Sequence, residues 1–306
     1  MKVLVVGFGS IGARHSNILR EMGHDVYVVT QQSEIGFPVF QCIGKALESE
    51  SFEYIVIANK TSDHYNVLAQ LVKKGVQCKI LVEKPVFNHF AKETSEFSNL
   101  KIFVGYNLRF HPLISKLKDL LQKQSIISAA IYFGQYLPNW RPNRDYRASY
   151  SSKKSEGGGV LRDLSHEMDY LLWIFGDWQR LTALGGHLSE LEVDTEDVVS
   201  AMLETRECPI LNLHINYLDR PSRREIIVNT KSQTVNVDLI RGTLQTNGTI
   251  TNHQVERNYT YKEQHLAILK GEMARLCTLN HGLKVLKMIE AIEVAIYSQE
   301  RIWISQ

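Results

Sequence analysis

The feature that most constrains the fold is the first twelve residues, where a short apolar strand runs directly into a glycine-rich turn. Val3 to Val6 are consecutive aliphatic residues, as in a strand buried on both faces of a parallel sheet. Gly7, Gly9 and Gly12 then form the pattern G-x-G-x-x-G. The first glycine permits a tight turn, the second lets the backbone approach a pyrophosphate, and the third allows the next helix to pack on the strand.

The residues after these glycines predict the helix that such a turn requires. Ile11, Ile18 and Leu19 recur at a helical spacing, and the helix is expected to begin near Ser10. Its free N–H groups and positive dipole end then point toward the phosphates of a dinucleotide. We interpret the segment as a dinucleotide-binding turn rather than an ordinary glycine-rich loop. The expected cofactor contacts are Gly7, Gly9, Ser10, Ile11 and Gly12.

Strands and helices alternate through the first third of the chain, which predicts a parallel, doubly wound sheet. Ligands of such a sheet bind at the carboxyl ends of its strands. The informative polar loops, 59–64, 83–85 and 106–112, fall at these ends. The strands predicted after the first are 25–30, 38–41, 54–58, 79–82 and 102–105.

The second half of the chain lacks this alternation. A predicted helix over 161–175 is followed by strand-like segments joined by short polar turns, which is typical of an antiparallel meander. We therefore predict an α/β protein with a Rossmann domain over 1–118 and an α+β domain with an open, largely antiparallel sheet over 119–306. Apolar and polar residues alternate over 211–217, so one face of this sheet is expected to meet solvent or another subunit. The predicted strands are 197–204, 210–218, 225–229, 234–238 and 243–246, and the terminal helices are 261–279 and 282–300.

Composition excludes several classes of protein. The 306 residues include 44% hydrophobic and 22% charged residues, ordinary values for a folded chain long enough for two domains. No apolar run approaches the roughly 18 residues of a membrane span, and a net charge of +2 argues against a nucleic-acid binder. The four cysteines lack C-x-x-C spacing and the histidines lack metal-ligand spacing. We expect a cytoplasmic protein that binds no metal, membrane or nucleic acid.

Five motifs occur in order along the chain and together carry a family resemblance. They are Gly7–His15, Asn59–His64, Glu83–Pro85, Gly105–Phe110 and Gly157–Asp169. The chain resembles the Gfo/Idh/MocA oxidoreductases, the family of glucose–fructose oxidoreductase and inositol dehydrogenase, over essentially its whole length. The resemblance implies a nicotinamide cofactor, sugar-like or cyclic polyol substrates, and a homo-oligomer formed by packing the open C-terminal sheets.

Three residues are candidates for catalysis. Hydride transfer from an alcohol carbon requires a base for the hydroxyl proton, and the reverse reaction requires an acid. Lys84 follows the fifth strand and precedes a stiff proline, and its alternative is an ordinary solvated lysine. Asp163 and His166 are three residues apart, in reach along one helix, although the family often has its aspartate one position earlier, where Arg162 stands here. Their alternative is a helix cap at Asp163 and a buried, satisfied histidine at His166.

Further candidates follow the fourth, fifth and sixth strands. Asn59 and His64 are expected beside the cofactor, with a helix-capping role as the alternative for His64. Glu83 is expected to orient its loop or the ribose region. Asn107 and Arg109 are expected near the substrate, and the alternative for Arg109 is to brace the joint between the domains.

The end of the second strand bears on the choice between NAD and NADP. NAD enzymes usually place an acidic residue there to bind the ribose 2′-hydroxyl, but this chain has Thr30-Gln-Gln-Ser. The missing acid removes a repulsion against a 2′-phosphate, and Thr30 offers a hydroxyl contact. Arg14, on the first helix, is the cation able to reach it. The sequence therefore admits both cofactors and leans to NADP.

The loop over 136–147 supplies the substrate prediction. Aromatic rings stack on sugars, and arginine forks bind carboxylate or phosphate. We expect Trp140, Arg141 and Arg147 to contact an anionic or nucleotide-linked sugar. The alternative is a surface loop that grips a partner subunit.

Two functions are compatible with these residues. The first is an NAD(P)-dependent oxidoreductase that transfers a hydride to or from a hydroxyl-bearing carbon of a sugar-like substrate. The alternative is a dinucleotide-sensing regulatory protein on the same fold, because a fold does not dictate a function. Lys84 together with His166 favours the enzyme, since a sensor needs neither.

Overall fold

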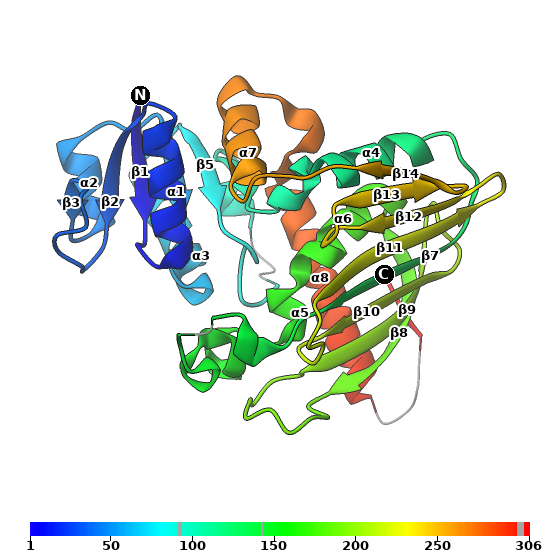
Figure 1. Ribbon diagram of the computed structural model, residues 1–306. Coiled ribbons are helices and arrows are strands. Elements are labelled where there is room, and N and C mark those ends of the chain that lie inside the picture. Colours follow the sequence, from blue (N-terminus) through cyan, green and yellow to red (C-terminus); the bar gives the residue numbers. More distant parts are fainter. Residues whose placement is uncertain (91–93, 142, 299–302) are drawn as a thin grey trace. The chain divides into compact units, whose positions relative to one another are not determined.

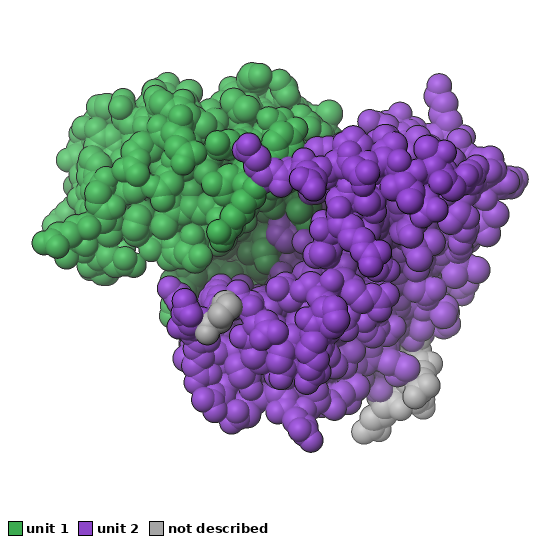
Figure 2. Space-filling model, viewed as in Figure 1, with its two compact units in different colours: residues 1–110, 257–286 green, residues 111–256, 287–306 purple. Residues whose placement is uncertain are grey.

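The computed structural model describes residues 1–90, 94–141, 143–298 and 303–306. They form two compact units (Figure 2). The first unit contains residues 1–110 and 257–286, and the second contains 111–256 and 287–306. This division differs from the boundary expected at residue 118, because a late segment of the chain returns to the first unit.

The first unit is built on a seven-stranded sheet in the order β15-β6-β5-β4-β1-β2-β3 (Figure 1). Strands β1 to β6 are all parallel, and the short β15 adds an antiparallel edge beside β6. The carboxyl ends of β1, β4, β5 and β6 therefore share one edge of the sheet. The strands are β1 (Lys2–Val6), β2 (Asp25–Val29), β3 (Val39–Phe40), β4 (Tyr54–Ile57), β5 (Lys79–Val82), β6 (Lys101–Val104) and β15 (Cys277–Thr278).

A helix from the far end of the sequence, α7 (Tyr259–Lys270), completes this unit. Its Ala267 and Ile268 are buried in the same core as Val3 and Val5 of β1. The predicted helix over 261–279 is wrong beyond Lys270, because Gly271 adopts a left-handed conformation (φ +77°) that ends α7. The other helices of at least seven residues here are α1 (Ser10–Glu21), α2 (Ile43–Ser49) and α3 (His64–Lys73).

The second unit contains a nine-stranded sheet in the order β14-β13-β12-β11-β7-β10-β9-β8-β16. Every neighbouring pair is antiparallel except β7 and β10, which are parallel. The predicted α/β class, with a Rossmann sheet and a largely antiparallel second sheet, is confirmed, although β7 and β8 were not among the predicted strands. The strands are β7 (Ile126–Gly134), β8 (Trp178–Gly186), β9 (Val198–Thr205), β10 (Leu211–Asn216), β11 (Arg223–Thr230), β12 (Thr234–Asp238), β13 (Thr243–Thr246), β14 (Thr249–Asn252) and β16 (Ile304–Ser305).

Strand β10 has the alternating burial that its sequence predicts. Leu211, Leu213 and Ile215 are buried, and Asn212 is exposed on the opposite face. Asn216 departs from the pattern because it is 2% exposed, and its side-chain oxygen accepts hydrogen bonds from backbone N–H groups of the following turn. The helices α4 (Pro112–Leu121), α5 (Val160–Asp163) and α6 (Ser165–Phe175) belong to this unit.

The last long helix, α8 (Leu279–Tyr297), begins in the first unit and continues in the second. It starts three residues before the predicted 282–300, and the predicted end at residue 300 lies outside the described residues.

The glycine turn yields a stability prediction. A Cβ at Gly12 would lie 2.0 Å from the carbonyl oxygen of Gly7, whereas a Cβ at Gly44, inside α2, would meet nothing within 4 Å. We expect Gly12→Ala to lower the free energy of unfolding by about 1–3 kcal/mol. Gly44→Ala, as the matched control, should raise it by about 0.5–1 kcal/mol because alanine is the better helix former. Urea unfolding of both variants checks this, and equal stabilities would contradict the packing at Gly12.

Candidate active site

The three glycines of the first turn have different surroundings, and the difference matches their expected roles. Gly7 has φ +98°, and a Cβ there would lie 2.7 Å from the backbone of Asn59. Gly12 is closed off by the Gly7 carbonyl. Gly9, by contrast, has an ordinary φ of −74° and open space where a Cβ would project. Only the middle glycine therefore faces room for a ligand, at the N-terminus of α1.

Two polar atoms at this sheet edge are buried without a hydrogen-bond partner among the described residues. They are Asn59 Oδ1, directly after β4, and His64 Nε2, at the start of α3. The His64 ring is 1% exposed, and its Nδ1 lies 3.1 Å from the Val86 carbonyl oxygen. Burial lowers the pKa of His64 despite the nearby carbonyls, so the neutral ring donates from Nδ1 and leaves Nε2 as an acceptor. His64 thus binds the loop after β5 instead of capping α3.

These features fit a dinucleotide at the carboxyl edge of the sheet. The open surface at Gly9 admits a pyrophosphate, and a polar ligand beside β4 gives Asn59 and His64 the partners they lack among the described residues.

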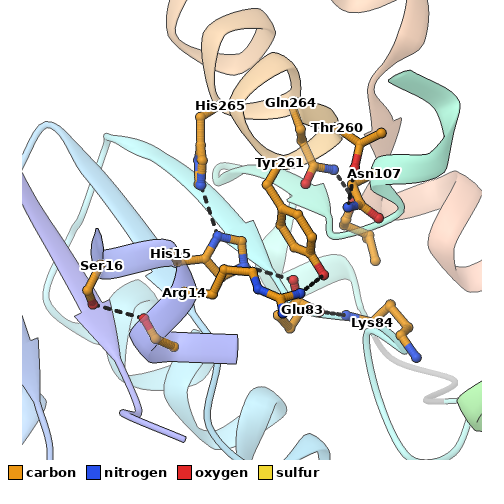
Figure 3. Close-up of polar contacts among 12 residues, drawn as sticks. Arg14, His15, Ser16, Glu83, Lys84, Asn107, Thr260, Tyr261, Gln264 and His265 are labelled. Carbon is orange, nitrogen blue, oxygen red and sulfur yellow. Dashed lines mark hydrogen bonds and ion pairs between the residues drawn. The ribbon is translucent and has the colours of Figure 1, made fainter. Parts of the chain in front are cut away.

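The end of β2 does not select clearly between NAD and NADP. Thr30 Oγ1 accepts the Gln32 backbone N–H, and Arg14 lies beside Tyr261, its guanidinium 3.5 Å from the hydroxyl (Figure 3). The structure therefore directs Arg14 toward α7 and not toward Thr30.

Glu83 and Lys84 follow β5 in the same unit. Glu83 is 9% exposed, and its Oε2 accepts the backbone N–H of Lys84 at 3.2 Å. Its Oε1 lies 2.9 Å from His15 Nε2. Burial alone would raise the pKa of Glu83, but the hydrogen bond from His15, together with the charge and backbone N–H of Lys84, lowers it overall. Glu83 is therefore an ionised group that holds the loop at Lys84, whose side chain is partly buried.

Asn107 and Arg109 lie after β6, and both are deeply buried, at 4% and 2% exposure. Asn107 Nδ2 donates to Thr260 Oγ1 of α7 at 2.9 Å. Arg109 donates to the Leu276 carbonyl at 3.3 Å. Both residues thus fasten the returning C-terminal segment to the first unit, and their contact with substrate stays a prediction.

Asp163 and His166 lie in the second unit on different helices. Leu164 (φ −96°, ψ 26°) interrupts the predicted single helix, so α5 ends at Asp163 and α6 begins at Ser165. The shared helical face expected for the pair is therefore wrong. Asp163 Oδ2 accepts the Tyr217 hydroxyl at 2.8 Å, and burial followed by the Asp163 charge raises the pKa of Tyr217 well above its usual value. His166 is partly buried in the first turn of α6.

Two of the residues predicted in the loop over 136–147 lie beside the hydrogen bond between Asp163 and Tyr217. Trp140 packs edge-on against Tyr217, with ring centroids 5.3 Å apart. Arg141 lies over the ring of Tyr150 at 5.9 Å, and the Tyr150 hydroxyl hydrogen-bonds to Asp163. Neither tyrosine was among the predicted site residues, although Tyr217 continues the apolar alternation of β10 and Tyr150 shortly precedes the three glycines.

Arg147 has a different environment from Arg141. Its guanidinium lies 2.9 Å from Asp145 Oδ2 and 3.1 Å from Glu192 Oε2. The fork expected for a substrate anion is therefore already paired with two carboxylates on an exposed surface.

Metal-binding clusters and membrane-spanning helices can be assessed for residues 1–90, 94–141, 143–298 and 303–306. Within these ranges, no group of three or more His, Cys, Asp or Glu side chains is arranged to hold a metal ion. No helix among the same residues is long and apolar enough to cross a membrane.

The parallel sheet and its glycine turn define the class of NAD-binding Rossmann oxidoreductases. Residues 1–98 match the family model for the oxidoreductase family with an NAD-binding Rossmann fold. Residues 115–245 match the model for the Gfo/Idh/MocA C-terminal domain. The chain belongs to the Gfo/Idh/MocA family of oxidoreductases.

Known proteins with related sequences or folds agree with this assignment. An uncharacterized oxidoreductase from Synechocystis sp. is 27% identical over 144 residues, a match that spans 45% of this chain but only 38% of the relative. Levoglucosan dehydrogenase in complex with NADH has a TM-score of 0.84 at 16% identity, covering 100% of this chain and 98% of that one. The WlbA dehydrogenase from Bordetella pertussis, in complex with NADH and UDP-GlcNAcA, has a TM-score of 0.79 at 17% identity, covering 100% and 97%. At these identities the solved structures establish a shared fold.

The open surface at Gly9 yields a binding prediction. We expect Gly9→Val to abolish dinucleotide binding, because the side chain would fill the space through which a pyrophosphate approaches. The fold should be retained, since a Cβ at Gly9 meets nothing within 4 Å. Fluorescence titration with NADPH and NADH, with a thermal melt as the control for folding, checks this. Undiminished affinity in a folded variant would refute the placement of the site.

Proposed function

We propose that this chain is an NAD(P)-dependent dehydrogenase that transfers a hydride to or from a hydroxyl-bearing carbon of a sugar-like substrate. The observation that carries the proposal is the convergence of three features at one sheet edge. They are the Gly9 surface after β1, the atoms of Asn59 and His64 after β4 that lack a partner among the described residues, and Lys84 after β5. Ligand binding at the carboxyl edge of a parallel sheet is the general rule for this architecture. Family membership supports the same chemistry.

Lys84 is proposed as the group that takes the hydroxyl proton during oxidation and returns it during reduction. A nicotinamide cofactor held at this edge would supply the acceptor or donor of the hydride. Glu83 holds the Lys84 backbone through its Oε2 and remains ionised beside it. Gly7, Ser10, Ile11 and Gly12 would shape the phosphate end of the site, and Thr30 its ribose end.

His166 and Asp163, which lie in the second unit, are proposed as further catalytic residues. Histidine is the side chain best suited to exchange a proton near neutral pH. Asp163 already accepts the hydroxyls of Tyr217 and Tyr150, which supports a role in ordering a polar network more than in transferring a proton itself.

An anionic or nucleotide-linked sugar is proposed as the substrate. Trp140 offers an aromatic face for a sugar ring, and Arg141 offers a fork for carboxylate or phosphate. The complexes of levoglucosan dehydrogenase with levoglucosan and of WlbA with UDP-GlcNAcA are those of sugar-like molecules, one of them anionic and nucleotide-linked. Asn107 and Arg109 stay candidates of lower rank, because both are buried and bonded within the chain, whereas Arg147 would exchange an exposed carboxylate partner.

We also propose a homo-oligomer formed through the open sheet, where Met202 and Ile227 are 47% and 37% exposed. A cytoplasmic location is proposed as well. All four cysteines are free thiols, as a reducing compartment requires.

The end of β2 supports a prediction on cofactor choice. No acid stands at Thr30-Gln-Gln-Ser to repel a 2′-phosphate. The Thr30 hydroxyl lies in this turn, where its oxygen accepts the Gln32 backbone N–H. We expect NADPH to bind at least as tightly as NADH. Parallel titrations of the wild-type protein check this. A preference for NADH of about tenfold, or roughly 1.4 kcal/mol, would overturn it.

The proposed role of Lys84 yields a kinetic prediction. We expect Lys84→Ala to lower turnover by about 10² to 10⁴, the usual contribution of general acid–base catalysis, while dinucleotide affinity and folding stay nearly intact. His166→Ala should also slow turnover, and the double variant should be less than additive if the two residues act together.

The measurement is single-turnover hydride transfer, followed by nicotinamide absorbance across a panel of acidic and nucleotide-linked sugars, with a thermal melt as the folding control. A Lys84→Ala enzyme with a near wild-type rate would make the lysine structural and move the proton transfer to His166. Dinucleotide binding without turnover on any sugar would favour the sensor.

A further inference from the structure

Four buried side chains of the first unit form an unbranched chain of hydrogen bonds that ends at Glu83. Tyr54 Oη lies 2.9 Å from His265 Nδ1, and His265 Nε2 lies 2.9 Å from His15 Nδ1. His15 Nε2 in turn lies 2.9 Å from Glu83 Oε1. Tyr54, His265 and His15 are each 0% exposed. The proposed chemistry uses Glu83 and Lys84 but gives the other three side chains no role.

The position of every proton in this chain follows from its far end, and ionised Glu83, which can only accept, requires the same order. His265 Nδ1 is the sole hydrogen-bond partner of the Tyr54 hydroxyl among the described residues, so the buried phenol must donate to it. His265 then carries its proton on Nε2 and donates to His15 Nδ1. His15, with Nδ1 occupied as an acceptor, carries its own proton on Nε2 and donates to Glu83.

If the hydrogen bonds were donated in the opposite direction, a defect would remain at each end of the chain of side chains. A proton on His265 Nδ1 would point at the Tyr54 oxygen and strand the phenolic proton without an acceptor. It would also require a positive charge or a lost hydrogen bond at His15. Burial lowers the pKa of His265 well below its usual value, with the neighbouring His15 and His24 acting in the same direction. Burial likewise raises the pKa of Tyr54 far above its usual value, followed by the Glu83 charge.

Glu83 thereby has both carboxylate oxygens engaged inside the protein. Oε1 accepts from His15, and Oε2 accepts from the Lys84 backbone N–H. Gly105 packs closely against the same carboxylate, because a Cβ at Gly105 would lie 2.8 Å from Oε1. The carboxylate is therefore held in one position, and Lys84 is the next residue along the chain.

We propose that Tyr54, His265 and His15 are positioning residues, a relay of donors all directed toward Glu83 that fixes the loop carrying Lys84. Helix α7 contributes the middle member, and Figure 3 shows His265 reaching down from α7 to His15 of α1, above Glu83 and Lys84. A residue 250 positions away from His15 in the sequence thus contributes to the geometry of the proposed catalytic loop. The role of the relay rests on the proposed function, whereas its existence does not.

The relay is tested first without any substrate. Nuclear magnetic resonance of the full-length protein with ¹⁵N-labelled histidine reports the tautomer of each ring. We expect His15 and His265 to be neutral near pH 7, each with its proton on Nε2. In Tyr54→Phe the hydroxyl that donates to His265 Nδ1 is gone, whereas ionised Glu83 still fixes both rings from the other end. We therefore expect the proton to stay on Nε2 of His265 and the Nδ1 resonance of that ring to shift. A proton on Nδ1 of either ring in the wild type, or an unchanged His265 Nδ1 resonance in Tyr54→Phe, overturns the relay.

The positioning role is tested by turnover on the substrate found for the enzyme. His265→Leu removes the donor to His15, whereas His265→Gln keeps an N–H near the same place. We expect His265→Leu to lower kcat about tenfold or more, because a displacement of about 1 Å in a reacting group can cost about 100-fold. KM should change little, and His265→Gln should recover much of the loss.

Gln264→Met is the matched control. Gln264 is a neighbour on α7, 1% exposed, and its amide donates to the Val104 carbonyl at 3.2 Å without joining the relay. We expect it to lower the melting temperature as His265→Leu does while keeping kcat. Equal losses of kcat in both variants, or a wild-type kcat in His265→Leu, would make the relay merely structural.

The kinetic test has a replacement variant, and two further outcomes separate this proposal from the proposed function. If His265→Leu does not fold, Tyr54→Phe replaces it in the kinetic test, and a wild-type kcat in that variant overturns positioning. If Lys84→Ala is fully active while the histidine tautomers are as expected, the role of Lys84 fails and the relay itself stands. If the expected tautomers are absent while Lys84→Ala is inactive, the relay fails and the role of Lys84 stands.

Discussion

The approach of α1 to the turn after β1 leaves room at residue 12 for a hydrogen atom and nothing larger. A Cβ there would lie 2.0 Å from the Gly7 carbonyl oxygen, and Gly7 is itself pressed against the backbone of Asn59. This one constraint ties β1, α1 and the end of β4 together. Gly9 lies between these two packed glycines and has open space where a Cβ would project. The surface proposed for the ligand is thus flanked by tight packing on both sides.

A second constraint comes from the segment that returns to the first unit. Ala267 and Ile268 of α7 are buried in the Rossmann core, while the polar side of the same helix meets His15 and Asn107. The helix therefore joins apolar burial, which stabilises the unit, to hydrogen bonds that reach the loops of the sheet edge. Substitutions in α7 can act on the chemistry without contacting a ligand.

Much of the fold could be predicted because its signals are local. The glycine turn, the buried run at 54–58 and the strands at 234–238 and 243–246 each depend on a few consecutive residues. The return of 257–286 could not be predicted, since apolar helix positions fit either core equally well. The end of α7 depended on Gly271 adopting a left-handed backbone, and a single glycine within a helical pattern does not reveal its conformation. The interruption of the helix at Leu164 is indicated even less clearly by the sequence.

The site could be predicted by residue type and by strand end, but not by partner. Arg109 and Arg147 look alike in sequence, yet one is 2% exposed and bound to a carbonyl, and the other pairs with carboxylates on an open surface. Surface ion pairs are weak and exchange readily, so an arriving anion needs only to replace one exposed partner of Arg147 with another. At Arg109 it would have to displace a buried hydrogen bond and then desolvate itself. The proposed anion contact is therefore less costly in the loop of Arg141 and Arg147 than at Arg109, which is buried and bonded to the returning segment.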